Sequence, residues 1–146
     1  MRAQERRLAV AIGLLVFMAA SQGSAALGEE RAPVVLRVAN STEKAVLRCQ
    51  LVLAHFMTGD LTPVGPGLVI EIDLLREVAT STLLYLGPGV RLIAVENILC
   101  GADGDWAATR NDIDLTALRD GSTQQLQMIC ADRGGLSCTA DETTKD

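Results

Sequence analysis

Apolar and polar residues alternate along much of the chain, which is the pattern of β-strands that bury one face in a core. The clearest run extends from Val46 to His55, and its inward positions are Leu47, Cys49, Leu51 and Leu53. A second run alternates in the same way, with Leu68, Ile70, Ile72 and Leu74 inward and Glu71 and Asp73 outward. Both runs therefore predict half-buried strands.

Further strands are expected where short apolar runs lie between turn residues. They cover residues 34–38, 82–86, 90–99, 124–131 and 136–138, whereas 113–118 reads as a short strand or turn and 75–80 as ambiguous, with a helical turn possible. Polar or Gly-Pro-rich segments at 40–44, 58–67, 87–89 and 101–112 separate them. Seven or eight short strands predict an all-β fold, a small antiparallel β-sandwich of immunoglobulin-like size, with a small closed barrel as the alternative.

The segment Asn40-Ser41-Thr42 matches the acceptor pattern for N-glycosylation. Short polar side chains of this kind also bond to their own backbone and so favour turns. We interpret the segment as a polar surface turn.

The N-terminus has the three parts of a secretory signal. A start with Arg2, Arg6 and Arg7 precedes an unbroken apolar run of 13 residues at 8–20, and small residues follow at 23–26. Thirteen residues are too few to span a bilayer, which takes about 20 in a helix. We expect a cleaved signal peptide at 1–26, with a cut after Ala26 or alternatively Ala25, and we favour general secretion over the twin-arginine route.

Removal of this leader leaves 120 residues with 10 basic and 17 acidic side chains, a net charge of −7. The expected organisation is an N-terminal extension at 27–33, a single domain at 34–139 and a flexible acidic tail at 140–146. The acidic balance argues against nucleic acid or anionic membranes as partners. No membrane span is expected after cleavage, so the protein is expected in the periplasm or outside the cell.

Four cysteines remain, Cys49, Cys100, Cys130 and Cys138. An even number in a small exported domain predicts two disulfides. The spacings of 50, 29 and 7 intervening residues lack the close pairs of a zinc site. Sequence alone permits three pairings, and we favour Cys49–Cys100 between strands and Cys130–Cys138 across a turn.

The chain offers little catalytic chemistry. Its single histidine, His55, is expected at the end of a strand, half buried and hydrogen-bonded, and no serine has the context of an activated nucleophile. Phosphate-loop and dinucleotide motifs are absent from the sequence. We therefore expect neither an enzyme nor a cofactor.

Two metal sites are considered as alternatives. Copper accepts imidazole and thioether ligands, which His55 and Met57 supply, with Met128 as a third candidate already assigned to a core position. Calcium accepts oxygen ligands, which Asp103 and Asp105 supply in the loop that ends near Asp112, although the order of a calcium loop is missing.

Trp106 is the only tryptophan, and it lies in a polar loop close to Arg110. Tryptophan and arginine are the residues most enriched in binding hot spots, because each desolvates a large area and keeps a polar group. The competing interpretation is that Trp106 folds back over the open end of the domain. The expected function is that of an exported, non-catalytic interaction protein that docks on a larger protein partner, with a metal-binding protein as the alternative.

Overall fold

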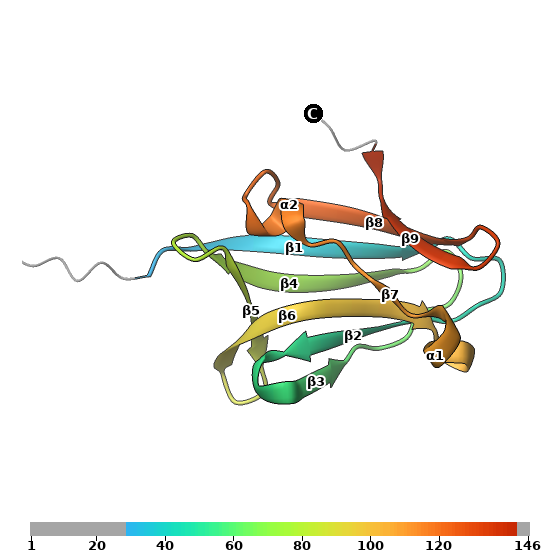
Figure 1. Cartoon of the computed structure of the whole chain (residues 1–146), viewed down its shortest axis with the longest axis horizontal. Helices are drawn as coiled ribbons and strands as arrows, with labels where there is room; N and C mark the ends of the chain where they lie inside the picture. Colours follow the sequence, from blue (N-terminus) through green and yellow to red (C-terminus); the bar gives the residue numbers. More distant parts are fainter. Residues whose placement is uncertain (1–28, 143–146) are drawn as a thin grey trace, which may run out of the picture.

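A computed structural model describes residues 29–142, and these residues are mostly β (Figure 1). The strands are β1 (Arg31–Asn40), β2 (Leu47–Leu53), β3 (Met57–Asp60), β4 (Val69–Glu77), β5 (Thr82–Gly87), β6 (Arg91–Ala102), β7 (Asn111–Asp112), β8 (Gln125–Asp132) and β9 (Leu136–Ala140). Short helical segments lie between some of them: η1 (Ala54–Phe56), η2 (Asp103–Asp105), α1 (Trp106–Thr109) and α2 (Thr116–Arg119). The prediction of a mostly β fold is confirmed.

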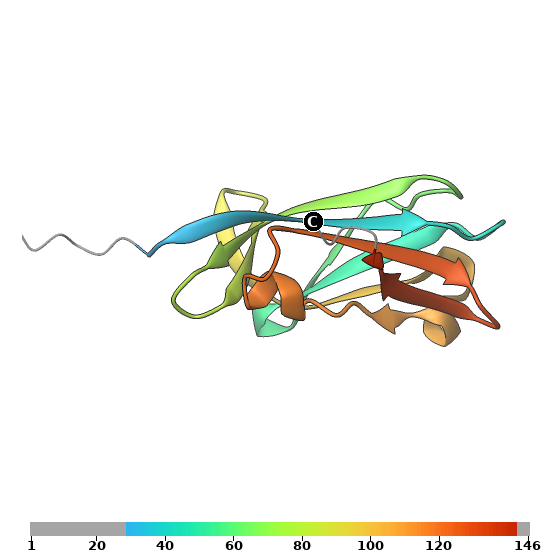
Figure 2. The ribbon, with the colours of Figure 1, turned by 90° about the horizontal axis from the view of Figure 1, so that it is seen from above.

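The strands join into one connected sheet in the order β3-β2-β6-β5-β4-β1-β8-β9, with β7 paired to β6. β6 links the two halves, since residues 91–94 pair with β5 and residues 95–102 pair with β2. The sheet curves around its core, so that β1 and β4 lie on one side of the fold and β2 and β6 on the other (Figure 2).

One strand pair departs from the antiparallel arrangement that the sequence predicts. β1 and β8 are parallel, with Leu36 opposite Leu126. Parallel neighbours cannot be joined by a tight hairpin and need a longer connection. Here β8 enters the sheet after the segment that contains α2, whose Leu118 is fully buried. The expected strand or turn at 113–118 thus includes a short helix that packs into the core.

The inward positions predicted for β2 and β4 and the core position of Met128 in β8 are confirmed, with one exception. The buried members are Leu47, Cys49, Leu51, Leu53, Ile70, Ile72, Leu74, Leu126, Met128 and Cys130, and they share one core. The inward position predicted for Leu68 is wrong, because its side chain is 59% exposed. Leu68 follows the turn at Gly67, which has a φ of +80°, and precedes the first residue of β4; its backbone N–H donates to the carbonyl oxygen of Gly65 at 3.2 Å.

Three element boundaries also differ from expectation. β3 occupies the start of the predicted loop at 58–67 and pairs with β2. β4 continues to Glu77 through the segment that the sequence left ambiguous. β1 begins at Arg31, opposite Glu77, inside the stretch that was expected to precede the domain.

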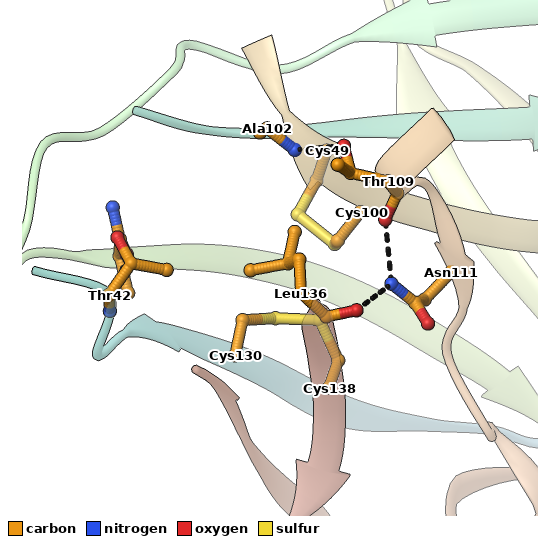
Figure 3. Close-up of a disulfide and its surroundings, with 10 residues drawn as sticks. Thr42, Cys49, Cys100, Ala102, Thr109, Asn111, Cys130, Leu136 and Cys138 are labelled. Atoms are coloured by element: carbon orange, nitrogen blue, oxygen red, sulfur yellow. Dashed lines mark hydrogen bonds between the residues drawn. A yellow bond between two sulfur atoms is a disulfide. The ribbon is translucent and has the colours of Figure 1, made fainter. Parts of the chain in front are cut away.

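Both predicted disulfide pairings are confirmed, and both join neighbouring strands (Figure 3). Cys49 of β2 lies opposite Cys100 of β6 with a Cα–Cα distance of 4.1 Å. Cys130 of β8 lies opposite Cys138 of β9 at 4.0 Å. Such close approach is that of a non-hydrogen-bonded antiparallel pair. The side chain of Leu136 lies between the two bridges.

Asn40 forms a buried polar hub at the end of β1. Its Nδ2 donates to the carbonyl oxygens of Ala45 at 2.9 Å and Val64 at 3.0 Å. Its Oδ1 accepts from the backbone N–H of Thr42 at 3.1 Å and from the Thr42 hydroxyl at 2.7 Å. The predicted turn is therefore present, but its assignment to the surface is wrong for Asn40 and Thr42, which are 1% and 5% exposed. Both amide hydrogens are used, so the folded acceptor pattern is closed to glycosylation.

The predicted signal peptide at 1–26 lies outside the described residues. Within the part that is described, no helix has the length and apolar character needed to cross a membrane.

Candidate functional site

The loop after β6 places Trp106 over the outer side of β2. Gly101 of β6 is paired with Arg48 of β2, and the backbone of Arg110 crosses directly above this glycine. A Cβ at position 101 would meet the Arg110 Cα at 2.8 Å, so only glycine permits the crossing. The Thr109 hydroxyl accepts from the backbone N–H of Ala102 at 2.8 Å and fixes the loop to the strand.

Trp106 contacts a charged group on β2. The guanidinium carbon of Arg48 lies 4.7 Å from the centroid of the Trp106 ring, which is a cation–π contact. Arg48 Nη2 also donates to Asp60 Oδ1 at 2.7 Å, and Gln50 Nε2 donates to the same oxygen at 2.9 Å. The hydrogen bond from Arg48, followed by that from Gln50, lowers the pKa of Asp60 below its ordinary value. We call Arg48, Gln50, Asp60, Trp106 and Arg110 the Trp106 corner.

The structure brings the two predicted partner-binding residues to the same corner. Trp106 is half-buried, and Arg110 is exposed. Within residues 29–142, the Arg110 side chain has no hydrogen-bond or ion-pair partner. The cation over the ring is Arg48, which sequence reasoning did not select, because its register opposite Gly101 depends on strands far apart in the chain. The only available signal was its outward position in the alternating run.

The structure separates Met128 from the other two copper candidates. His55 lies in η1 and Met57 is the first residue of β3, and both are exposed, while Met128 is buried in β8 at 3% exposure. His55 was expected to be half buried and hydrogen-bonded, and the expected burial is wrong because the residue is exposed. The residue has a φ of 63°, and this left-handed turn directs it away from the core.

The calcium candidates are divided between two elements. Asp103 and Asp105 are exposed in η2, whereas Asp112 accepts a hydrogen bond from Asn97. Asn111 donates to the carbonyl oxygens of Thr109 and Leu136, so its amide joins the loop to β9 (Figure 3). Over residues 29–142, no three His, Cys, Asp or Glu side chains gather in a way that would hold a metal.

An apolar groove on the outer face of the sheet is a second candidate surface, and sequence reasoning missed it. It has a volume of about 330 Å³, and its lining includes Pro33, Val35, Asp73, Leu75, Leu84 and Leu86 from β1, β4 and β5. Leu84 is 9% exposed yet lies outside the main core cluster. The signal was present in Val35 and Leu75, which are apolar at outward positions of their strands.

Comparison with protein-family models, curated proteins and solved structures finds no match to this chain. Its function is therefore inferred from its own residues.

Proposed function

We propose that this chain is exported behind a cleaved leader, folds as a sandwich-like β domain in the periplasm or outside the cell, and acts there without catalysis by docking on a larger protein. Two disulfides in a domain of this size support an oxidising compartment. The acidic charge supports a protein as partner in preference to nucleic acid or an anionic membrane.

The contact between Arg48 and Trp106 carries this proposal. Asp60 and Arg48 form a salt bridge, and the guanidinium is held over the ring, so the aromatic group is positioned before any partner arrives. A side chain that is already ordered loses less conformational entropy on binding. The half-buried ring keeps a free area for a second apolar contact.

Arg110 defines the chemistry of the partner. It is an exposed cation at the edge of the corner, and the described residues supply it with no anion. The proposed partner is a protein segment that presents a carboxylate to Arg110 and an apolar or aromatic side chain to Trp106. Arginine binds carboxylates with two parallel hydrogen bonds, which gives such a contact orientation as well as affinity.

Site-specific photocrosslinking tests the proposal. A benzophenone amino acid replaces Ala107, which is exposed in α1 beside Trp106. The matched control carries the same group at Ala79, an exposed alanine in the turn between β4 and β5, at the end of the fold away from α1 (Figure 1). Both proteins are irradiated in the cell envelope, and the adducts are identified by mass spectrometry.

The proposal predicts one discrete protein adduct from position 107 that is absent from position 79. Trp106→Ala and Arg110→Glu in the same background should reduce this adduct. Equal crosslinking from both positions, or an adduct that neither substitution changes, would contradict docking through the Trp106 corner.

A further inference from the structure

The turn between β2 and β3 presents an aromatic side chain to solvent. Phe56 has an exposure of 102%, and its neighbour Met57 is 43% exposed. The whole apolar surface of this ring is in contact with water, and the chain has only two phenylalanines in 146 residues. Phe56 is therefore a candidate anchor for another surface.

The backbone of this turn is strained in a way that keeps Phe56 outward. His55 and Phe56 have φ values of 63° and 62°, a left-handed conformation that glycine and asparagine adopt most readily. A bulky side chain in this region raises the energy of the turn, and such strain is concentrated at functional sites. Phe56 thus occupies a position where glycine would fit the backbone better.

The same chain carries a surface that fits an aromatic side chain. The groove of β1, β4 and β5 is lined mainly by apolar side chains, and Leu86 on its wall is 54% exposed. Its volume of about 330 Å³ is sufficient for a phenyl ring. At its far side the outer face becomes polar, where Arg37 Nε lies 3.4 Å from Glu71 Oε2. The groove is thus bounded as well as apolar.

The turn and the groove face in different directions. Figure 2 shows the β5–β6 turn, β1 and β4 along one side of the fold, with the β2–β3 turn on the opposite side. Phe56 therefore does not fill the groove of its own chain. A second copy can offer its Phe56 to this groove while leaving its own groove open.

We propose that Phe56 of one copy seats in the β1–β4–β5 groove of a second copy, so that the protein associates head to tail. His55 next to the ring carries an N–H donor, and Asp73 on the groove rim carries a carboxylate that can accept a hydrogen bond from it. A contact of one turn in one groove is small, so the association is weak and reversible. The net negative charge opposes it, and salt should strengthen it by screening this repulsion.

Sedimentation velocity over a concentration series tests this proposal with three variants of the protein. Phe56→Gly removes the ring and suits the left-handed backbone, so it should lower association at least tenfold without any loss of thermal stability. Leu86→Glu should block the groove to a similar degree. Leu68→Glu alters an apolar side chain that is 59% exposed away from both surfaces, and it should associate like the wild type.

Mixing the two defective variants gives the decisive result. Phe56→Gly keeps an intact groove and Leu86→Glu keeps an intact ring, so an equimolar mixture should form a one-to-one dimer although each variant alone is a monomer. A mixture that stays monomeric, or a wild type that is monomeric at millimolar concentration, would overturn the proposal. The wild type could instead bind phosphatidylcholine vesicles through Phe56 and show no self-association. That result would overturn the proposal in favour of a lipid surface. The Trp106 corner is not involved, so failure here leaves the proposed function untouched.

Discussion

The guanidinium of Arg48 and the ring of Trp106 are 58 positions apart in sequence and lie 4.7 Å apart in the fold. Their contact depends on the register of β2 against β6, because Arg48 opposes Gly101 and the loop after Gly101 returns the tryptophan over the strand. A disulfide between Cys49 and Cys100 holds the adjacent pair of the same ladder. The Trp106 corner thus lies next to one of the two disulfides.

The carboxyl of Asp60 should titrate below its ordinary value of 3.8, because the folded state supplies hydrogen bonds from Arg48 and Gln50 to the ionised form. Since the folded pKa is lowered, the resulting stabilisation is present above pH 3.8 and is lost as the pH falls through the folded value. Carboxyl NMR titration checks this directly. Arg48→Gln should raise the pKa of Asp60 towards 3.8, and Gln50→Ala should raise it less.

Gly101→Ala should reduce the free energy of unfolding by about 1–3 kcal/mol, the usual cost of forcing an extra methyl group into a packed site. The added Cβ would be 2.8 Å from the Cα of Arg110, so the backbone has to move. Gly104→Ala is the matched control in the same loop, because no atom lies within 4 Å of its added Cβ. Urea unfolding compares the two, and equal stability would show that the loop does not lie over Gly101.

Asn40→Ala should lower stability by about 3 kcal/mol, because it removes four hydrogen bonds and leaves buried backbone groups without partners. Ser41→Ala alters the exposed neighbour and should change stability by less than about 0.5 kcal/mol. Chemical denaturation of both variants provides the comparison. Similar free energies of unfolding for the two variants would contradict the role of Asn40 as a hydrogen-bonding hub.

The two disulfides should contribute unequally to stability. In the chain-entropy relation, the Cys49–Cys100 bridge with a sequence separation of 51 is worth about 4 kcal/mol, and the Cys130–Cys138 bridge with a separation of 8 about 2.5 kcal/mol. Paired alanine substitutions of each bridge, followed by denaturant unfolding, measure the difference. A larger loss from the shorter loop would contradict this account.

The parts of the fold that follow local patterns were predictable from sequence. Alternation placed Leu47 and Ile72 in the core, and the even number of cysteines predicted two disulfides, of which the favoured pairing among three is the one that the structure contains. Patterns of period two carry information about which face is buried, because one residue of shift exchanges the two faces of a strand.

Features that depend on long-range register were beyond the sequence. The parallel pairing of β1 with β8 and the placement of Arg48 under Trp106 both require the relative positions of distant strands. His55 was misplaced for a different reason: its left-handed φ of 63° is unusual for a non-glycine residue, so local preferences favoured a continuing strand. The groove was overlooked because its apolar residues occupy outward positions on three strands, each of which looks ordinary by itself.

The most direct test of the Trp106 corner is an affinity measurement. The partner identified by crosslinking is purified, and its binding to variants of this protein is compared. Titration calorimetry should show that Trp106→Ala weakens the affinity at least about 30-fold, the loss of roughly 2 kcal/mol that defines a binding hot spot. Phe56→Gly, which alters the opposite end of β2, should change it by less than about twofold. Unchanged affinity of Trp106→Ala in a stably folded protein would contradict the account.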